Sequence, residues 1–118
     1  MNDHEKVVEF LKSQTHMVVA VTLPNGQPWA VPVRILHHEG TAFEWDSMMS
    51  TEHSKAIAEH PEIMLLCFDT KKDDQAGVYM NATVTDITPK EHGAARYCAE
   101  VSKAWLNDET YVKREVIM

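Results

Sequence analysis

The stretch STEHSKAI, residues 50–57, combines residue types that often hold an anion at the start of a helix. Ser50 or Thr51 can cap a helix, which places Ser54 and Lys55 in its first turn. The first amides of a helix have no intrahelical acceptor, and the helix dipole adds partial positive charge there. A phosphate can accept hydrogen bonds from these amides, the Ser54 hydroxyl and the Lys55 ammonium. An ordinary capped helix with a solvated lysine uses the same residues, so local physics leaves both interpretations open.

The seven histidines do not have the spacing of a metal site. His37 and His38 are adjacent, so on a strand they point to opposite faces, and His53 and His60 lie too far apart on one helix to share an ion. We expect no metal site, and His37, His38 and His53 are acid–base candidates only because imidazole titrates near neutral pH. The sequence has no G-x-S-x-G, G-x-G-x-x-G or G-K-[ST] motif, so it predicts no serine-hydrolase elbow, Rossmann site or P-loop.

The elements that position these residues follow from hydrophobic periodicity and turn signals. The pattern predicts helices over 3–13, 51–59 and 89–106. It predicts strands over 16–23, 28–38, 41–46, 62–69 and 78–87, a loop over 70–77, and a last strand or frayed tail over 111–118. The apolar run 62–69 is typical of a strand buried on both faces. Consecutive antiparallel strands with few helices predict an α+β fold, mainly antiparallel β, built as a small barrel.

Proline and cysteine add local constraints. Pro28 and Pro32 cannot donate to a sheet ladder, so part of 28–38 is predicted to be an edge or a bulge. Cys67 and Cys98 both lie within apolar patterns, which favours buried free thiols over a disulfide or a metal site.

Composition limits the class of protein. The 118 residues fit one domain, 1–118, and a chain this short leaves apolar surface that a dimer can cover. The formal charge of −7 is the wrong sign for nucleic acid. We expect no membrane partner, because no apolar run approaches the length of a membrane span. The charged N-terminal stretch lacks the apolar segment of a signal peptide, so we expect a cytoplasmic protein.

Five short motifs follow one another within residues 7–88. They are Gly26-Gln27-Pro28, Val31-Pro32-Val33, Phe43-Glu44-Trp45-Asp46-Ser47, Ser54-Lys55 and His60-Pro61. Each is weak alone, but their order and spacing resemble the pyridoxamine 5′-phosphate oxidase-like family of flavin-binding split β-barrels. The resemblance implies a split β-barrel with flanking helices that forms a homodimer, with two cofactor sites at the subunit interface.

The resemblance also implies FMN as the cofactor, with coenzyme F420 or heme as alternatives. It assigns cofactor contacts to Val31, Pro32, Val33, Arg34, Trp45, Asp46, Ser47, Ser54, Lys55, Gln75 and Trp105. In this assignment the start of the 51–59 helix holds the phosphate, and strand residues 31–34 run beside the cofactor. Backbone groups of 45–47 meet its ring or ribityl chain. The partner subunit contributes from around 75–81 or from the last helix, with Trp105 as its candidate.

The implied activity is that of an FMN-binding oxidoreductase acting with a small-molecule substrate or electron donor that the sequence does not identify. The alternative is a non-catalytic flavin-, F420- or heme-binding stress or carrier protein. The full oxidase of this family has an arginine at the position of Val31 and another just before the helix lysine, where Ser54 stands here. Its C-terminal substrate-binding segment is not recognisable either. A smaller flavin-binding relative is therefore expected rather than an enzyme that oxidises pyridoxamine phosphate.

Overall fold

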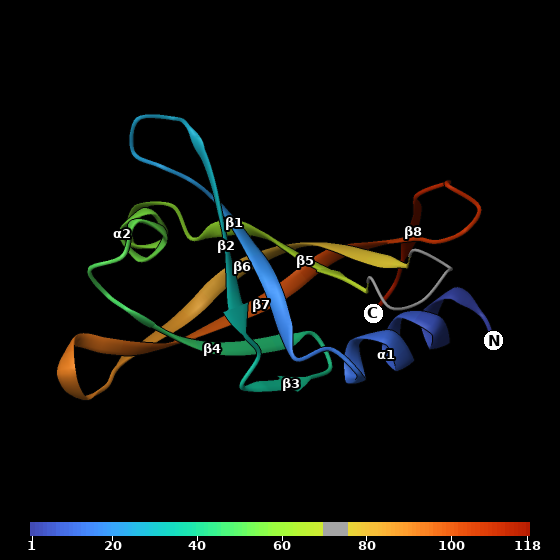
Figure 1. Cartoon of the computed structure of the whole chain (residues 1–118), viewed down its shortest axis with the longest axis horizontal. Helices are drawn as coiled ribbons and strands as arrows, with labels where there is room; N and C mark the ends of the chain where they lie inside the picture. The colour runs from blue at the N-terminus through green and yellow to red at the C-terminus, as the bar shows by residue number, and fades with distance from the viewer. Residues whose placement is uncertain (70–75) are drawn as a thin grey trace.

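A computed structural model describes residues 1–69 and 76–118. In these ranges one eight-stranded antiparallel sheet is flanked by a helix at each end, as Figure 1 shows. The helical elements are α1 (Asp3–Lys12), α2 (Glu52–Glu59) and the 3-10 turn η1 (Glu91–Gly93). The strands are β1 (His16–Thr22), β2 (Pro28–Arg34), β3 (His37–Glu39), β4 (Ala42–Met48), β5 (Glu62–Phe68), β6 (Gly77–Pro89), β7 (Ala94–Asn107) and β8 (Arg114–Val116).

The strand order is β2-β1-β5-β6-β7-β4-β3, and β8 pairs with the outer part of β7. β2 and β4 lie far apart in this order, yet they are in contact, so the sheet bends back on itself. The mainly antiparallel α+β class predicted from the sequence is confirmed. No helix in the described ranges has the length and apolar character that a membrane crossing needs.

The core fills the inside of this bend. Strand residues alternate between buried and partly exposed along β1 and β5, so one face of each strand points inward. Phe43, Trp45, Leu65 and Met80 are fully buried there. The prediction that 62–69 is buried on both faces is therefore wrong, because its second face is only half-covered. Cys67 is a buried free thiol, and burial raises its pKa to about 12.

β2 is the edge strand that its two prolines predicted. Leu23 N–H donates to the Gln27 carbonyl at 2.8 Å and Ile35 N–H to the Thr15 carbonyl at 2.8 Å. In this register, odd-numbered residues of β2 bond to β1, while even-numbered residues direct their backbone groups outward. Pro28 and Pro32 are even-numbered, so they remove donors from the free edge and none from the ladder. This protects the edge from pairing with another strand.

The predicted strand 28–38 is two strands with different partners. Ile35 still bonds to the β1 side, but Leu36 N–H donates to the Glu44 carbonyl at 2.9 Å. The chain thus leaves β1 at Ile35 and begins to pair with β4 as β3. Because residues 28–38 are largely apolar, their pattern does not indicate where the chain changes its pairing partner.

The predicted helix over 89–106 is wrong. These residues form η1 and then β7, which pairs with β6 on one side and β4 on the other. The alanine-rich sequence has helical propensity, but two neighbouring strands satisfy its backbone and override that propensity. Ala95, Tyr97 and Ala99 are buried in alternation, as a strand requires. The tail also contains a short strand, β8, so its strand interpretation is correct for 114–116.

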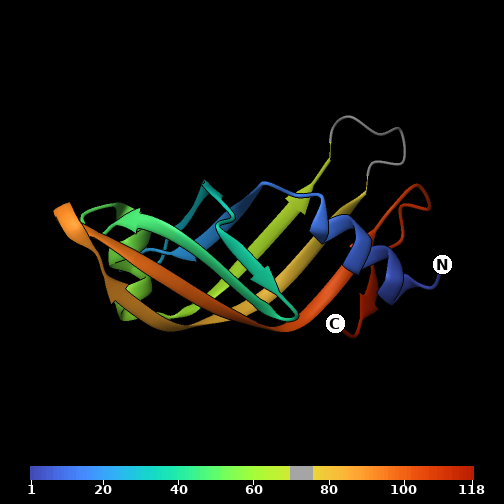
Figure 2. The ribbon, with the colours of Figure 1, turned by 90° about the horizontal axis from the view of Figure 1, so that it is seen from below.

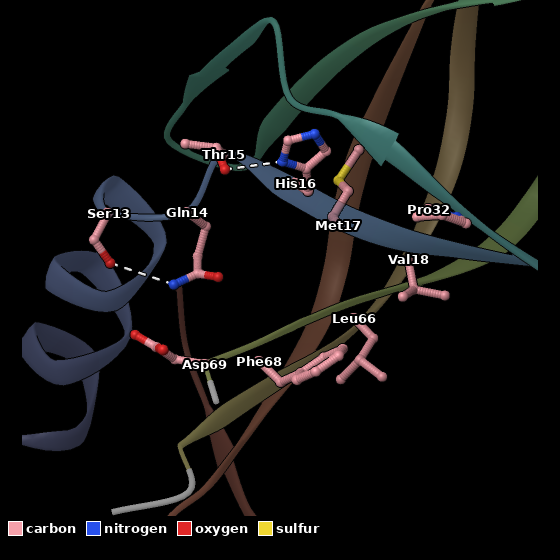
Figure 3. A pocket seen from close by; sticks show the side chains of 10 residues that line it. All are labelled: Ser13, Gln14, Thr15, His16, Met17, Val18, Pro32, Leu66, Phe68 and Asp69. Atoms are coloured by element: carbon pink, nitrogen blue, oxygen red, sulfur yellow. Dashed lines mark hydrogen bonds between the residues drawn. The ribbon is translucent and has the colours of Figure 1, made fainter. Parts of the chain in front are cut away.

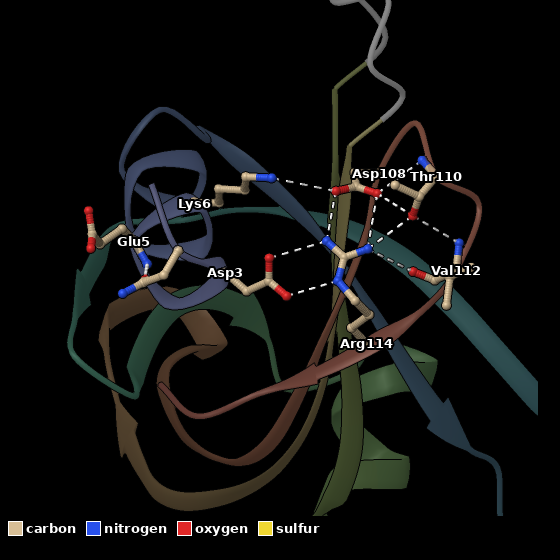
Figure 4. Close-up of polar contacts among 8 residues, drawn as sticks. Asp3, Glu5, Lys6, Asp108, Thr110, Val112 and Arg114 are labelled. Atoms are coloured by element: carbon tan, nitrogen blue, oxygen red, sulfur yellow. Dashed lines mark hydrogen bonds and ion pairs between the residues drawn. The ribbon is translucent and has the colours of Figure 1, made fainter.

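A cluster of ion pairs joins the two ends of the chain. Figures 1 and 2 both show α1 beside β8, at the opposite end of the molecule from α2. Arg114 donates to Asp108 at 2.8 Å and to Asp3 at 2.8 Å, which links β8 to α1 (Figure 4). Lys6 lies 3.9 Å from the same Asp108 carboxylate.

Candidate functional site

The start of α2 is a well-formed capped turn. Thr51 is the N-cap, and its side chain accepts a hydrogen bond from Ser54 N–H at 3.3 Å. The Thr51 hydroxyl also lies 2.9 Å from the Met48 carbonyl and 2.8 Å from the Ser54 hydroxyl. Met49 N–H donates to the Gly93 carbonyl at 2.9 Å, which fixes the exit of β4. The capped helix predicted from STEHSKAI is confirmed, with Ser54 buried in the turn.

Lys55 lies next to this turn with its side chain in solvent. It is exposed, and within the described residues it forms no ion pair. α2 contains no other lysine or arginine. The structure therefore combines an unpaired cation with the positive end of a helix, which is the arrangement that favours an anion.

His53 joins α2 to the end of β4, and the sequence interpretation gave it no place in the site. Its side chain is buried, with 6% of the residue exposed. Nε2 lies 2.9 Å from the Ser47 hydroxyl and 3.5 Å from the Thr51 hydroxyl. Burial lowers the pKa of His53, so the imidazole is neutral at neutral pH. The sequence indicates only that His53 can titrate. Its contact with Ser47 could not be predicted, because it depends on the path of the chain between β4 and α2.

The β2 residues assigned to the cofactor divide between two faces. Val33 points inward and is buried, and Val31 is half-buried on the same side. Pro32 and Arg34 are exposed on the opposite face. α2 contacts β2, and β2 contacts β4, so the strand that contains these residues adjoins both elements.

Two of the three β4 residues assigned to the cofactor, Trp45 and Asp46, have side chains that are engaged within the chain. Trp45 is fully buried and stacks on Tyr97 with ring centroids 5.6 Å apart, so its ring belongs to the core. Its Nε1 has no hydrogen-bond partner among the described residues. The Asp46 carboxylate pairs with Arg96, whose hydrogen bonds lower the Asp46 pKa. The side chain of Asp46 is therefore already occupied.

The remaining assigned residues are not brought to the α2 start. Trp105 lies on β7, not on a helix, and β1, β5 and β6 separate it from β2. At about 4.8 Å per strand this is about 19 Å when followed along the sheet. Gln75 lies outside the described residues.

Trp105 belongs to a row of apolar residues that crosses five strands on the outside of the bend. The strand registers align Pro32, Val18, Leu66, Tyr79 and Trp105. On one side of this row the next aligned positions are Ala30, Ala20 and Met64, followed by the polar Asn81 and Lys103. We call the whole set the outer face: Val18, Ala20, Ala30, Pro32, Met64, Leu66, Phe68, Tyr79 and Trp105. Each is half-buried or exposed, and Phe68 is 54% exposed.

A cavity of about 320 Å³ opens at one end of the outer face. Figure 3 shows polar side chains from the link between α1 and β1 on one side and apolar side chains of β2 and β5 on the other. Its polar part includes the Thr15 hydroxyl, 2.9 Å from His16 Nδ1. The cavity shares Pro32 with the strand assigned to the cofactor, and shares Val18, Leu66 and Phe68 with the outer face. It is separate from the α2 start.

The other histidines do not gather into a metal centre. His38 is half-buried and stacks on Phe43 with ring centroids 4.1 Å apart. Burial lowers its pKa, and its Nε2 lies 3.0 Å from the Gly40 carbonyl. Within 1–69 and 76–118, no group of three histidine, cysteine or acidic side chains is arranged to hold an ion.

A comparison with protein family models identifies the family of this chain. The family model described as pyridoxamine 5′-phosphate oxidase matches residues 3–117. The chain belongs to this family. The match includes β7, β8 and the C-terminal loop, which extend beyond the motifs at 7–88. No curated protein sequence matches the chain.

Several solved structures share the fold at low sequence identity. One is a protein from Clostridium acetobutylicum related to general stress protein 26 of the pyridoxinephosphate oxidase family. It is 15% identical with a TM-score of 0.79, over 95% of this chain and 93% of that chain. A heme-binding protein from Mycobacterium smegmatis is 13% identical with a TM-score of 0.83, over 98% of this chain and 58% of its own. An F420 reductase is 12% identical with a TM-score of 0.73, over 88% of this chain and 97% of its own.

Proposed function

We propose that this protein is an FMN-binding oxidoreductase that acts as a homodimer, with each cofactor between the two subunits. The observation that carries the proposal is the juxtaposition of the α2 start, β2 and the end of β4 in a chain of this family. The α2 start offers an unpaired Lys55, and the end of β4 offers the Ser47 hydroxyl. Bound FMN would supply the electron transfer, while the protein holds and orients it.

The proposed phosphate position is the first turn of α2. Lys55 would provide the positive charge that FMN's phosphate needs, because family arginines are absent at Val31 and Ser54. The Ser54 hydroxyl is buried and lies 2.8 Å from Thr51, so it would act chiefly by holding the turn in shape. Backbone groups of 45–47 and the strand 31–34 would then lie along the rest of the cofactor.

The outer face supports a homodimer. Its aligned apolar row is half-covered in one chain, and a contiguous apolar surface of this kind marks a contact with another molecule. A second copy docked there would bring its Trp105 toward the site of the first. The same contact would cover the cavity edge formed by Val18, Leu66 and Phe68.

A spectrum of the purified protein tests the cofactor. We expect a yellow protein with a flavin band near about 450 nm, or uptake of added FMN with a change in flavin fluorescence. Reduction of the bound flavin by NADH, NADPH or a chemical reductant would show that it is redox-active. A colourless protein that takes up no FMN would overturn the proposal. A Soret band or an F420 spectrum would instead assign the site to one of the other two cofactors.

Replacing Lys55 with alanine should weaken FMN binding by about 1–3 kcal/mol, because it removes a charge-assisted hydrogen bond to the phosphate. Isothermal titration calorimetry measures the change. Riboflavin has the same ring without the phosphate, so its affinity should not change. Lys12→Ala is the matched control, since Lys12 is an exposed lysine at the end of α1. Equal losses for FMN and riboflavin would show that Lys55 does not contact the phosphate.

A further inference from the structure

The hydrogen bond between His53 and Ser47 can exist in two forms. Nε2 of His53 lies 2.9 Å from Ser47 Oγ, and either atom can supply the proton. If Ser47 donates to an unprotonated Nε2, the serine has only lone pairs left for a ligand. If Nε2–H donates to Ser47, the serine hydroxyl proton is free to point elsewhere. The choice of tautomer therefore decides whether Ser47 can donate to a ligand.

Among the described residues, the Ser47 hydroxyl is the nearest hydrogen-bond partner of His53 Nε2. The Thr51 hydroxyl is farther away, at 3.5 Å, and it already lies 2.8 Å from Ser54 Oγ and 2.9 Å from the Met48 carbonyl. His53 is buried, so water does not compete freely for its ring. Ser47 is half-buried and can still reach a ligand at the α2 start.

We propose that His53 is a positioning residue whose Nε2–H tautomer makes Ser47 a hydrogen-bond donor to the FMN phosphate. This rests on the proposed function and adds a residue that the sequence did not assign. A phosphate oxygen accepts hydrogen bonds but carries no donor when ionised, so it selects the form in which Ser47 donates outward. A neutral imidazole achieves this without adding charge.

Two substitutions of His53 distinguish a requirement for an N–H donor at the Nε2 position from a requirement for the shape of the side chain. In His53→Gln the side-chain amide can place an N–H near the position of Nε2, whereas in His53→Asn it reaches only toward Nδ1. We expect His53→Asn to lower FMN affinity about tenfold, the effect of one lost hydrogen bond, and His53→Gln to stay within about threefold of the wild type. Riboflavin affinity should be unchanged in both variants. His60→Asn, at the exposed end of α2, is the matched control and should change nothing.

A double-mutant cycle tests whether His53 acts through Ser47. Ser47→Ala should lose about tenfold in FMN affinity, and adding His53→Asn should cost nothing more, because the two residues form one unit. The ¹⁵N shifts of the His53 imidazole provide a second readout and should report the Nε2–H tautomer in the FMN complex. An Nδ1–H tautomer, additive losses, or equal losses for FMN and riboflavin would overturn the inference. If the wild type binds no FMN, the proposed function itself is refuted, whereas FMN binding that His53→Asn leaves unchanged refutes only the role of His53.

Discussion

Replacing Leu66 with aspartate should convert the proposed dimer to a monomer and abolish most of the proposed FMN binding. Leu66 lies in the middle of the aligned row on the outer face, between Val18 and Tyr79. A carboxylate there must be desolvated if a second copy docks, and a buried unpaired charge costs far more than one interface contact supplies. In one chain the position is only half-buried, so the monomer should still fold.

Sedimentation velocity separates a 13.4 kDa monomer from a dimer, and titration of each variant with FMN measures the site. Ile87→Asp is the matched control, because Ile87 is 42% exposed on the part of β6 that extends beyond the aligned row. We expect the control to remain dimeric and to bind FMN as the wild type does. An L66D monomer with full FMN affinity would show that one chain contains the whole site. An L66D variant that stays dimeric would place the interface elsewhere.

Most elements before β6 were predictable from the sequence because its signals there are local, and the division of 28–38 into β2 and β3 was an exception. Asn25-Gly26 marked the first hairpin, and Gly26 has the positive φ of 87° that such a turn requires. Pro28 and Pro32 marked an edge strand by removing backbone donors, and this depends on chemistry rather than on distant contacts. Thr51 capped α2 for the same kind of reason.

The sequence failed at β7 because the deciding interactions are not local. Residues 94–107 contain several alanines, and Ala95, Cys98, Val101 and Ala104 fall at helical spacing by coincidence. What makes them a strand is pairing with β6 and β4 along its length. Asn81 pairs with Lys103 and Ala82 with Val101, so Ser102 is an extra residue on β7 that breaks the simple alternation typical of a strand.

In the candidate site, too, local features were predictable from the sequence and contacts between distant elements were not. Lys55 and the capped turn were predictable, because both belong to one short stretch of sequence. The His53–Ser47 contact was not, since it crosses from a helix to a strand and depends on the path of the turn between them. Trp105 was expected on the last helix, but it lies on β7. Its place on the outer face became visible only from the strand register.

Replacing Asp108 with asparagine should destabilise the fold by about 2–3 kcal/mol, because it breaks the ion pair with Arg114 and leaves Asp3 as the one carboxylate that pairs with Arg114 among the described residues. Only 6% of the Asp108 side chain is exposed. Its carboxylate accepts hydrogen bonds from Arg114 at 2.8 Å and from the Thr110 hydroxyl at 2.7 Å (Figure 4). Asparagine keeps the size of the side chain but turns an N–H₂ group toward these donors. Urea unfolding at neutral pH measures the loss.

The pH dependence of that loss identifies its cause. Hydrogen bonds from Arg114 hold the Asp108 pKa well below its ordinary value of 3.8. Because the folded-state pKa is lowered, the stabilisation is complete above about pH 3.8 and disappears as the pH falls below it. The difference in unfolding free energy between the wild type and Asp108→Asn should therefore be constant near neutral pH and should decrease in acid. Asp46→Asn removes an exposed pair with Arg96 and should cost less than about 1 kcal/mol. A difference for Asp108→Asn that does not decrease in acid would mean that packing, and not the ion pair with Arg114, joins β8 to α1.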